Sequence, residues 1–165
     1  MREIEMMRTI ALRFSNNFAP ECGTIKAHEE LIALTGFVWY GKLGSKVSAK
    51  VEQDILANPS PRILLIHSGS IGRYWAHIDK IQSETPPLQE IPAYYRDRAE
   101  DFASWFRVLR IEDAAKNVLS QCYVASSGAS LSIASRHSMN PYFIIDYKAA
   151  DEFSNKAQKA SPLEE

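Results

Sequence analysis

The sequence predicts an α+β fold, with a curved, barrel-like mixed sheet of about six strands and flanking helices. Two observations predict it. Strand-like and helix-like segments follow one another without strict alternation, and residues 62–81 have the pattern of a β-hairpin with its turn at 68–72. Strict alternation would favour a parallel sheet, whereas a hairpin in the middle of the chain favours antiparallel pairing.

The spacing of apolar residues predicts each element in turn. Segments with alternating or continuous β-prone side chains are predicted strands, at residues 9–14, 37–40, 62–67, 73–81, 105–111 and 142–147. Segments with a helical spacing of apolar residues are predicted helices, at residues 25–34, 46–57 and 114–121. Thr24 and Asp113 are the expected caps of the first and third helices.

Two long stretches have no clear period. Residues 82–103 contain three prolines, and a long loop of this kind inside a compact domain is usually functional. Residues 125–135 are rich in Ser, Gly and Ala and are expected to form a second connection. With 165 residues, the chain is long enough for one domain with its own core. We expect a leader over 1–8, this domain over 9–148 and a polar tail or linker over 149–165.

Composition excludes several classes of protein. Nineteen basic and twenty acidic residues give a net charge of −1, which excludes a protein that coats nucleic acid by bulk charge. Two cysteines a hundred residues apart, Cys22 and Cys122, make neither a disulfide framework nor a zinc site, and they favour a reducing cytoplasm. The longest aliphatic run, residues 63–66, is far too short to span a membrane. No metal-ligand spacing and no glycine-rich phosphate loop occurs, so we expect no metal and no cofactor.

Aromatic residues beside basic ones are the most informative pattern. Trp39 and Tyr40 precede a glycine-rich turn, and Tyr94 and Tyr95 lie in the proline-containing loop next to arginines. A base flipped out of a duplex needs two or three aromatic walls, which these residues could form. A tryptophan at a strand end is more often a core residue than a cage wall, which is the alternative for Trp39, and the mid-strand residues Trp75 and Trp105 are expected in the core.

Three lysines at intervals of four follow Trp39, at positions 42, 46 and 50. If they lie on one helix face, Lys42, Lys46 and Lys50 form an exposed cationic stripe that could hold a phosphate backbone. The simpler alternative is an ordinary solvated face. Two other functions stay open: a protein–protein adaptor, and a small magnesium-dependent nuclease using Asp146 and Lys148, although no further carboxylate occurs between Asp113 and Asp146.

The order of these segments resembles that of the YTH and EVE domains in the PUA-like superfamily. The opening strand that runs into residues 15–17, the Gly-Phe-Val-Trp segment at 36–39 and the central pair at 63–78 are similar to the family pattern. The Trp-Phe-Arg-Val segment at 105–108 and Arg136 also match it. The resemblance covers about residues 10–147.

The resemblance implies a PUA-like fold and a non-enzymatic reader of a methylated, flipped base. The residues implied at the base are Trp39, Tyr40, Tyr94, Tyr95, Ser15, Asn16 and Asn17. The residues implied at phosphates are Arg136, Lys42, Lys46 and Lys50. The expected partner is DNA or RNA with a modified base, such as methyladenine or a modified cytosine. DNA in a McrBC-type restriction system is the implied context, with a fused or associated GTPase motor and a nuclease subunit.

Overall fold

The computed structural model describes residues 6–17, 19–68 and 71–148. Its strands are β1 (Met6–Phe14), β2 (Val38–Lys42), β3 (Arg62–His67), β4 (Arg73–Gln82), β5 (Ser104–Asp113), β6 (Cys122–Val124) and β7 (Tyr142–Lys148). Its α-helices are α1 (Thr24–Thr35), α2 (Ala49–Leu56) and α3 (Leu131–His137). Its 3-10 helices are η1 (Leu88–Glu90), η2 (Ala93–Asp101) and η3 (Val118–Gln121).

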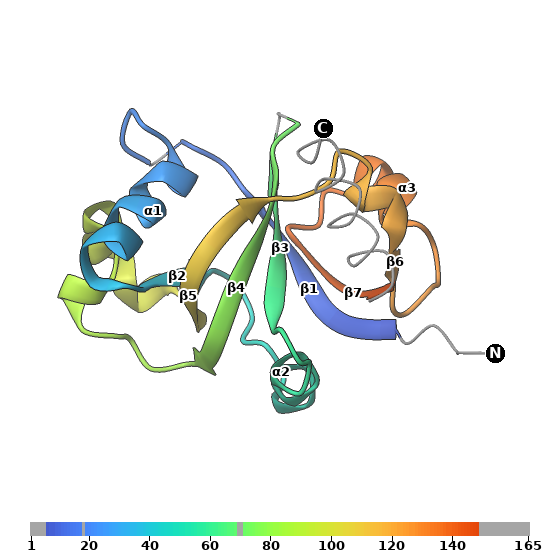
Figure 1. Ribbon diagram of the computed structural model, residues 1–165, viewed down its shortest axis with the longest axis horizontal. Helices are drawn as coiled ribbons and strands as arrows, with labels where there is room; N and C mark the ends of the chain where they lie inside the picture. Colours follow the sequence, from blue (N-terminus) through green and yellow to red (C-terminus); the bar gives the residue numbers. More distant parts are fainter. Residues whose placement is uncertain (1–5, 18, 69–70, 149–165) are drawn as a thin grey trace, which may run out of the picture.

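The strands form one mixed sheet in the order β2-β5-β4-β3-β1-β7-β6 (Figure 1). Neighbouring strands are antiparallel except β1 and β3, which are parallel. The sheet is so curved that β2, at one edge, comes back against the start of β7. The ammonium nitrogen of Lys42 on β2 lies 4.4 Å from the ring centroid of Tyr142 on β7. The predicted α+β fold with a curved mixed sheet is therefore confirmed.

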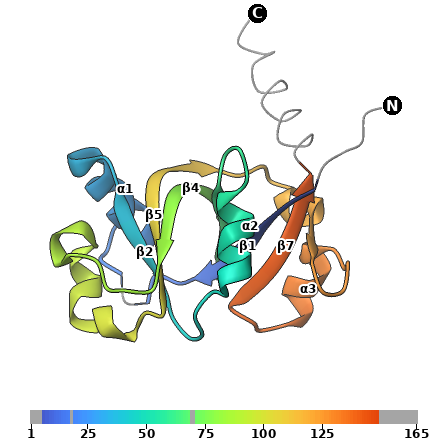
Figure 2. The same cartoon turned by 90° about the horizontal axis from the view of Figure 1, so that it is seen from below.

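The helices cover different parts of this sheet (Figures 1 and 2). Helix α1 packs on β2 and β5, α2 on β1 and β4, and α3 on β6 and η3. The largest apolar cluster lies between the sheet and the first two helices, and a second joins β1, β3 and β7 to α3 and η3. A third lies under η1 and η2 and contains the fully buried Trp105. Trp75 is also buried, so the core assignment of both tryptophans is confirmed.

Most predicted elements are confirmed. The differences lie at element ends and in short segments, where a few local contacts determine the structure. Strand β1 already begins at Met6, because it pairs with β7 from that residue onward. Residues 6–8 of the predicted leader at 1–8 thus belong to β1, while residues 1–5 and the predicted tail at 149–165 lie outside the described residues. The expected helix at 114–121 was wrong: only the 3-10 turn η3 forms there. The stretch at 125–135 contains the start of α3, whose Ser130 hydroxyl accepts from the Ser132 N–H.

The lysine stripe was also wrong. Helix α2 begins at Ala49 rather than 46, because Ser48 caps it by accepting a hydrogen bond from the Val51 N–H. Lys42 consequently lies on strand β2 and is 6% exposed, while Lys46 lies in the preceding loop. Residues on a strand and in a loop do not share a helix face, so the three lysines form no continuous stripe.

Candidate nucleic-acid interface

A pocket of about 440 Å³ opens where the curved sheet almost closes on itself. The end of β1, the end of β2, the start of β7 and the 3-10 segment η2 surround it. Six aromatic rings contribute to its lining, those of Phe14, Tyr40, Tyr94, Tyr95, Phe102 and Tyr142. The charged residues among its described lining are Arg13, Lys42 and Arg98, with no Asp or Glu.

The long proline-containing stretch supplies one wall of the pocket. In η2, the ring of Tyr95 lies edge-on to Tyr94 at 4.8 Å between centroids and tilted against Phe102 at 4.6 Å. Phe102 in turn lies directly on β2 at Gly41, where an added Cβ would come within 2.6 Å of the ring. A glycine is therefore needed there for the wall to approach the strand. The functional role expected for residues 82–103 stays a prediction. The structure shows that this stretch forms one wall of the pocket.

A buried histidine supports two of the pocket tyrosines from behind. The His28 ring lies 5.1 Å from Tyr40 and 5.3 Å from Tyr95, centroid to centroid, and its Nδ1 is 2.9 Å from the Thr24 carbonyl oxygen. Complete burial lowers the pKa of His28 to about 4, only partly opposed by the Thr24 contact. His28 is therefore neutral at physiological pH. Sequence reasoning missed this role, although Thr24 and His28 share a helix face at i, i+4 spacing.

The tyrosines of the pocket keep their protons. Burial raises the pKa of Tyr95 well above its usual value, and it also raises those of Tyr40, Tyr94 and Tyr142. Nearby phenol groups add to the shift for Tyr40 and Tyr95. At neutral pH each hydroxyl can therefore donate as well as accept a hydrogen bond, which suits the mixed donor and acceptor edge of a base.

Two of the pocket cations are bound by carbonyl groups. The Lys42 ammonium donates to the carbonyl oxygens of Leu43 at 3.2 Å and Ser45 at 2.5 Å, and burial lowers its pKa. The Arg13 guanidinium donates to the carbonyl oxygens of Ser135 and, at 2.8 Å, Ser138. These contacts tie the β2 turn and the end of α3 to the rim of the pocket.

The third pocket cation, Arg98, lies on η2. Its Nε is 3.8 Å from the Asp101 carboxylate.

The structure brings five of the predicted site residues into this pocket, namely Ser15, Tyr40, Lys42, Tyr94 and Tyr95. Trp39 is not among the lining residues. It is 3% exposed, and its indole N–H donates to the Glu90 carboxylate at 2.9 Å. Successive side chains on a strand point to opposite faces, so the Trp39 side chain leaves β2 on the face opposite to that of Tyr40. Trp39 instead packs beneath η1 and η2.

The other predicted residues lie outside the pocket. The Asn16 side-chain oxygen accepts from the Thr24 N–H at 3.0 Å, so Asn16 satisfies the start of α1. Asn17 and Lys46 are exposed, and the exposed Arg136 donates to the Ser132 carbonyl on its own helix.

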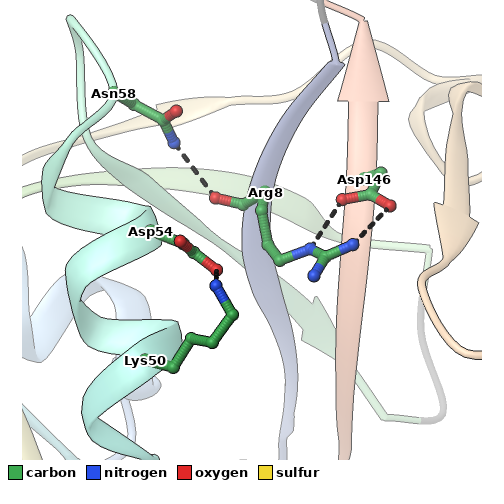
Figure 3. A network of polar contacts seen from close by, with 5 residues as sticks. All are labelled: Arg8, Lys50, Asp54, Asn58 and Asp146. Carbon is green, nitrogen blue, oxygen red and sulfur yellow. Dashed lines mark hydrogen bonds and ion pairs between the residues drawn. The ribbon is translucent and has the colours of Figure 1, made fainter.

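Lys50 lies on α2, in the network shown in Figure 3. Its ammonium is 3.7 Å from the Asp54 carboxylate, and beside this pair Arg8 donates to both oxygens of Asp146 at 2.9 and 3.1 Å. Asn58 donates to the Arg8 carbonyl. Asp146, the carboxylate of the nuclease alternative, thus joins β7 to β1 through an ion pair. Among the described residues, no group of three metal-ligating side chains occurs.

Sequence reasoning missed Arg13, Phe14, Phe102 and Tyr142 as pocket residues. Arg13, Phe14 and Tyr142 lie far in the chain from the η2 wall of the pocket, whereas Phe102 packs on Tyr95 within the same proline-containing stretch. Arg98 carried a local signal, since it lies close to the tyrosine pair in the sequence. Phe102 carried a similar signal because it lies in the same stretch, whereas no local signal marks Arg13, Phe14 or Tyr142.

The family model for Pua-like domains matches residues 10–157. This chain belongs to the Pua-like family. The resemblance to the PUA-like superfamily and the predicted fold are thereby confirmed. No curated protein and no solved structure matches the chain. Pua-like domains commonly bind nucleic acids, which makes the tyrosine-lined pocket the leading candidate for a base site. None of the described helices is long and apolar enough to cross a membrane.

Proposed function

We propose that this Pua-like domain is a non-enzymatic reader that takes an extruded, methylated base of a nucleic acid into the tyrosine-lined pocket. The observation that carries the proposal is the pocket itself, with six aromatic residues and only positive charges in its described lining. Its volume of about 440 Å³ lies within the range of small-ligand sites. Each base stacked on an aromatic side chain contributes about 1–3 kcal/mol to binding.

The proposed contacts differ from those of the sequence-based cage. Tyr94 is one of three half-buried rings in the pocket lining, with Phe102 and Tyr142, and is proposed to stack on the base. The Tyr40 and Tyr142 hydroxyls and Ser15 are proposed to bond its edge. Trp39 is proposed to support the wall from the core rather than to touch the base.

The phosphates on either side are proposed to meet exposed cations. Arg98 lies in the pocket lining, while Lys46, Lys50 and Arg136 are exposed elsewhere on the surface. The resemblance to YTH and EVE domains supports a methylated base, such as N6-methyladenine or 5-methylcytosine. It also supports DNA as the ligand, within a restriction system whose motor and nuclease lie in other domains or subunits.

A stacking role for Tyr94 is tested by Tyr94→Ala. We expect the variant to bind a methylated oligonucleotide at least about ten-fold more weakly, the value of one stacked base. The measurement is fluorescence anisotropy with labelled single strands and duplexes that are unmodified or carry N6-methyladenine or 5-methylcytosine, at one low salt concentration.

The matched control is Tyr123→Ala, because Tyr123 is also half-buried but lies on β6, outside the pocket lining. It should bind like the natural sequence. Equal losses in both variants, or none in Tyr94→Ala, would contradict the proposed site. Salt-insensitive binding to a protein instead would favour an adaptor.

A further inference from the structure

We infer that the pocket selects neutral modified bases and rejects bases that carry a positive charge. The inference rests on the proposed function and specifies its ligand class. Several methylated bases are cations at neutral pH, among them 1-methyladenine and 3-methylcytosine. Their isomers N6-methyladenine and N4-methylcytosine are neutral and nearly equal in size. The members of each pair differ in charge and in the position of the methyl group, so the test has to separate the effect of charge from that of shape.

The charges in the pocket lining are all of one sign. Lys42, Arg13 and Arg98 are cationic, and no described lining residue is an Asp or Glu. For Arg98, the Asp101 carboxylate at 3.8 Å offsets part of the charge. The Lys42 and Arg13 side chains donate hydrogen bonds to carbonyl oxygens, which carry no net charge.

The tyrosines do not compensate for these cations. Their phenols stay protonated because burial raises the pKa values of Tyr40, Tyr94, Tyr95 and Tyr142. A cationic base in this pocket would therefore meet the positive charges of Lys42 and Arg13. The pocket is partly enclosed, so water screens this repulsion poorly.

An aromatic pocket would ordinarily attract a cation through its ring faces. Here the protein has already placed its own cation against one of the walls. The Lys42 ammonium lies 4.4 Å from the centroid of the Tyr142 ring. A cationic base would have to displace this ammonium or share the ring with it. A neutral base can stack on the remaining rings and accept hydrogen bonds from nearby donors.

The test compares isomeric bases at one position of the same oligonucleotide. The full chain is titrated with probes carrying adenine, N6-methyladenine or 1-methyladenine, and with the matching set of cytosine, N4-methylcytosine and 3-methylcytosine. We expect the neutral isomer of the preferred pair to bind at least about ten-fold more tightly than its cationic isomer, or about 1.4 kcal/mol. Equal or tighter binding of the cationic isomer would overturn the inference.

Charge is separated from shape by Lys42→Met, which keeps a long apolar side chain but removes the ammonium. We expect the neutral-over-cationic preference to shrink at least about three-fold, while Lys80→Met, a control at an exposed lysine on β4 outside the pocket lining, leaves it unchanged. An unchanged preference in folded Lys42→Met would contradict the role of Lys42. If that variant does not fold, the natural sequence is titrated with the 3-methylcytosine probe above the pKa of that base, where the base loses its charge and should regain affinity. No recovery there would contradict a charge-based rejection.

The outcomes also separate this inference from the proposed function. Preference for a methylated neutral base over its unmodified parent, with equal binding of the cationic isomer, supports a base reader and refutes the charge selection. Failure of every modified and unmodified probe to bind refutes the proposed function, and the selection with it.

Discussion

Trp39 and Tyr40 show how one residue step decides the role of an aromatic side chain. Both precede the same turn, and both were reasonable walls for a base. The period of two along β2 directs Tyr40 to the pocket and Trp39 to the opposite side, under the 3-10 segments. The sequence locates the aromatic wall to within one residue. It could not decide the face, because that depends on which side of β2 the distant η2 segment covers.

Substitution of Trp39 should therefore affect stability more than binding. Trp39→Phe removes the indole donor to Glu90 and part of a buried ring, and we expect the free energy of unfolding to fall by about 1–3 kcal/mol. Affinity for the methylated probe should stay within about two-fold of the natural value. Chemical denaturation and anisotropy measure the two quantities. Glu90→Gln, which keeps an acceptor at this position, is the control and should cost less stability. A large loss of affinity in a folded Trp39→Phe would restore Trp39 to the base site.

At the scale of elements, long periodic segments were predictable and short ones were not. The strands that form the centre of the sheet carry strong apolar patterns, and their predictions are confirmed. The three-residue strand β6 and the seven-residue helix α3 have too few residues for a period to show. They are stabilised by contacts with β7 and η3. The 3-10 wall of the pocket was recognisable only as a long loop with prolines.

His28 on helix α1 should make the free energy of unfolding depend on pH in the acid range. Its pKa in the folded protein, about 4, lies below the ordinary value of 6.5, so the unfolded chain binds this proton more readily between those two pH values. Stability from the buried neutral ring is therefore complete above about pH 6.5 and declines as the pH falls toward 4. The full shift corresponds to about 3 kcal/mol.

The measurement is chemical denaturation of the natural sequence and of His28→Gln across this pH range. His28→Gln should be less stable at neutral pH because it disturbs the packing against Tyr40 and Tyr95, but its stability should fall less on acidification. Because both proteins share every other titrating group, including His77 and Glu112, the difference between the two curves isolates His28. Parallel curves would show that His28 is not held neutral in the fold.

At the scale of the whole molecule, a net charge of −1 means that any phosphate contacts must come from a local group of cations. The candidate contacts are Arg98 and the exposed Lys46, Lys50 and Arg136, of which Lys50 and Arg98 already have carboxylates nearby. We expect the logarithm of the association constant to fall with the logarithm of salt concentration with a slope of about −2 to −4. Lys46→Gln or Arg136→Gln should make the slope shallower by about one where the residue touches phosphate. A slope near zero would contradict a nucleic-acid ligand.

The closed shape of the sheet is the property least visible in the sequence. The predicted strands, hairpin and helices were enough to predict a curved α+β fold, and the family match confirms the fold family. The pocket exists only because β2 returns to β7 across a hundred residues of chain, which places Lys42 on Tyr142. No local pattern records that contact. Three of the six pocket aromatics, Tyr40, Tyr94 and Tyr95, were consequently predictable from the sequence, whereas Phe14 on β1 and Tyr142 on β7 were not.

The central claim is that a base enters the tyrosine-lined pocket, and tyrosine-selective NMR tests it most directly. Ring resonances of the seven tyrosines can be followed while an oligonucleotide with N6-methyladenine or 5-methylcytosine is added to the full chain. The prediction is that the signals of Tyr40, Tyr94, Tyr95 and Tyr142 shift on binding, while those of Tyr74, Tyr123 and Tyr147 stay in place. Binding that leaves the four pocket signals unchanged, or that shifts only the other three, would contradict the claim.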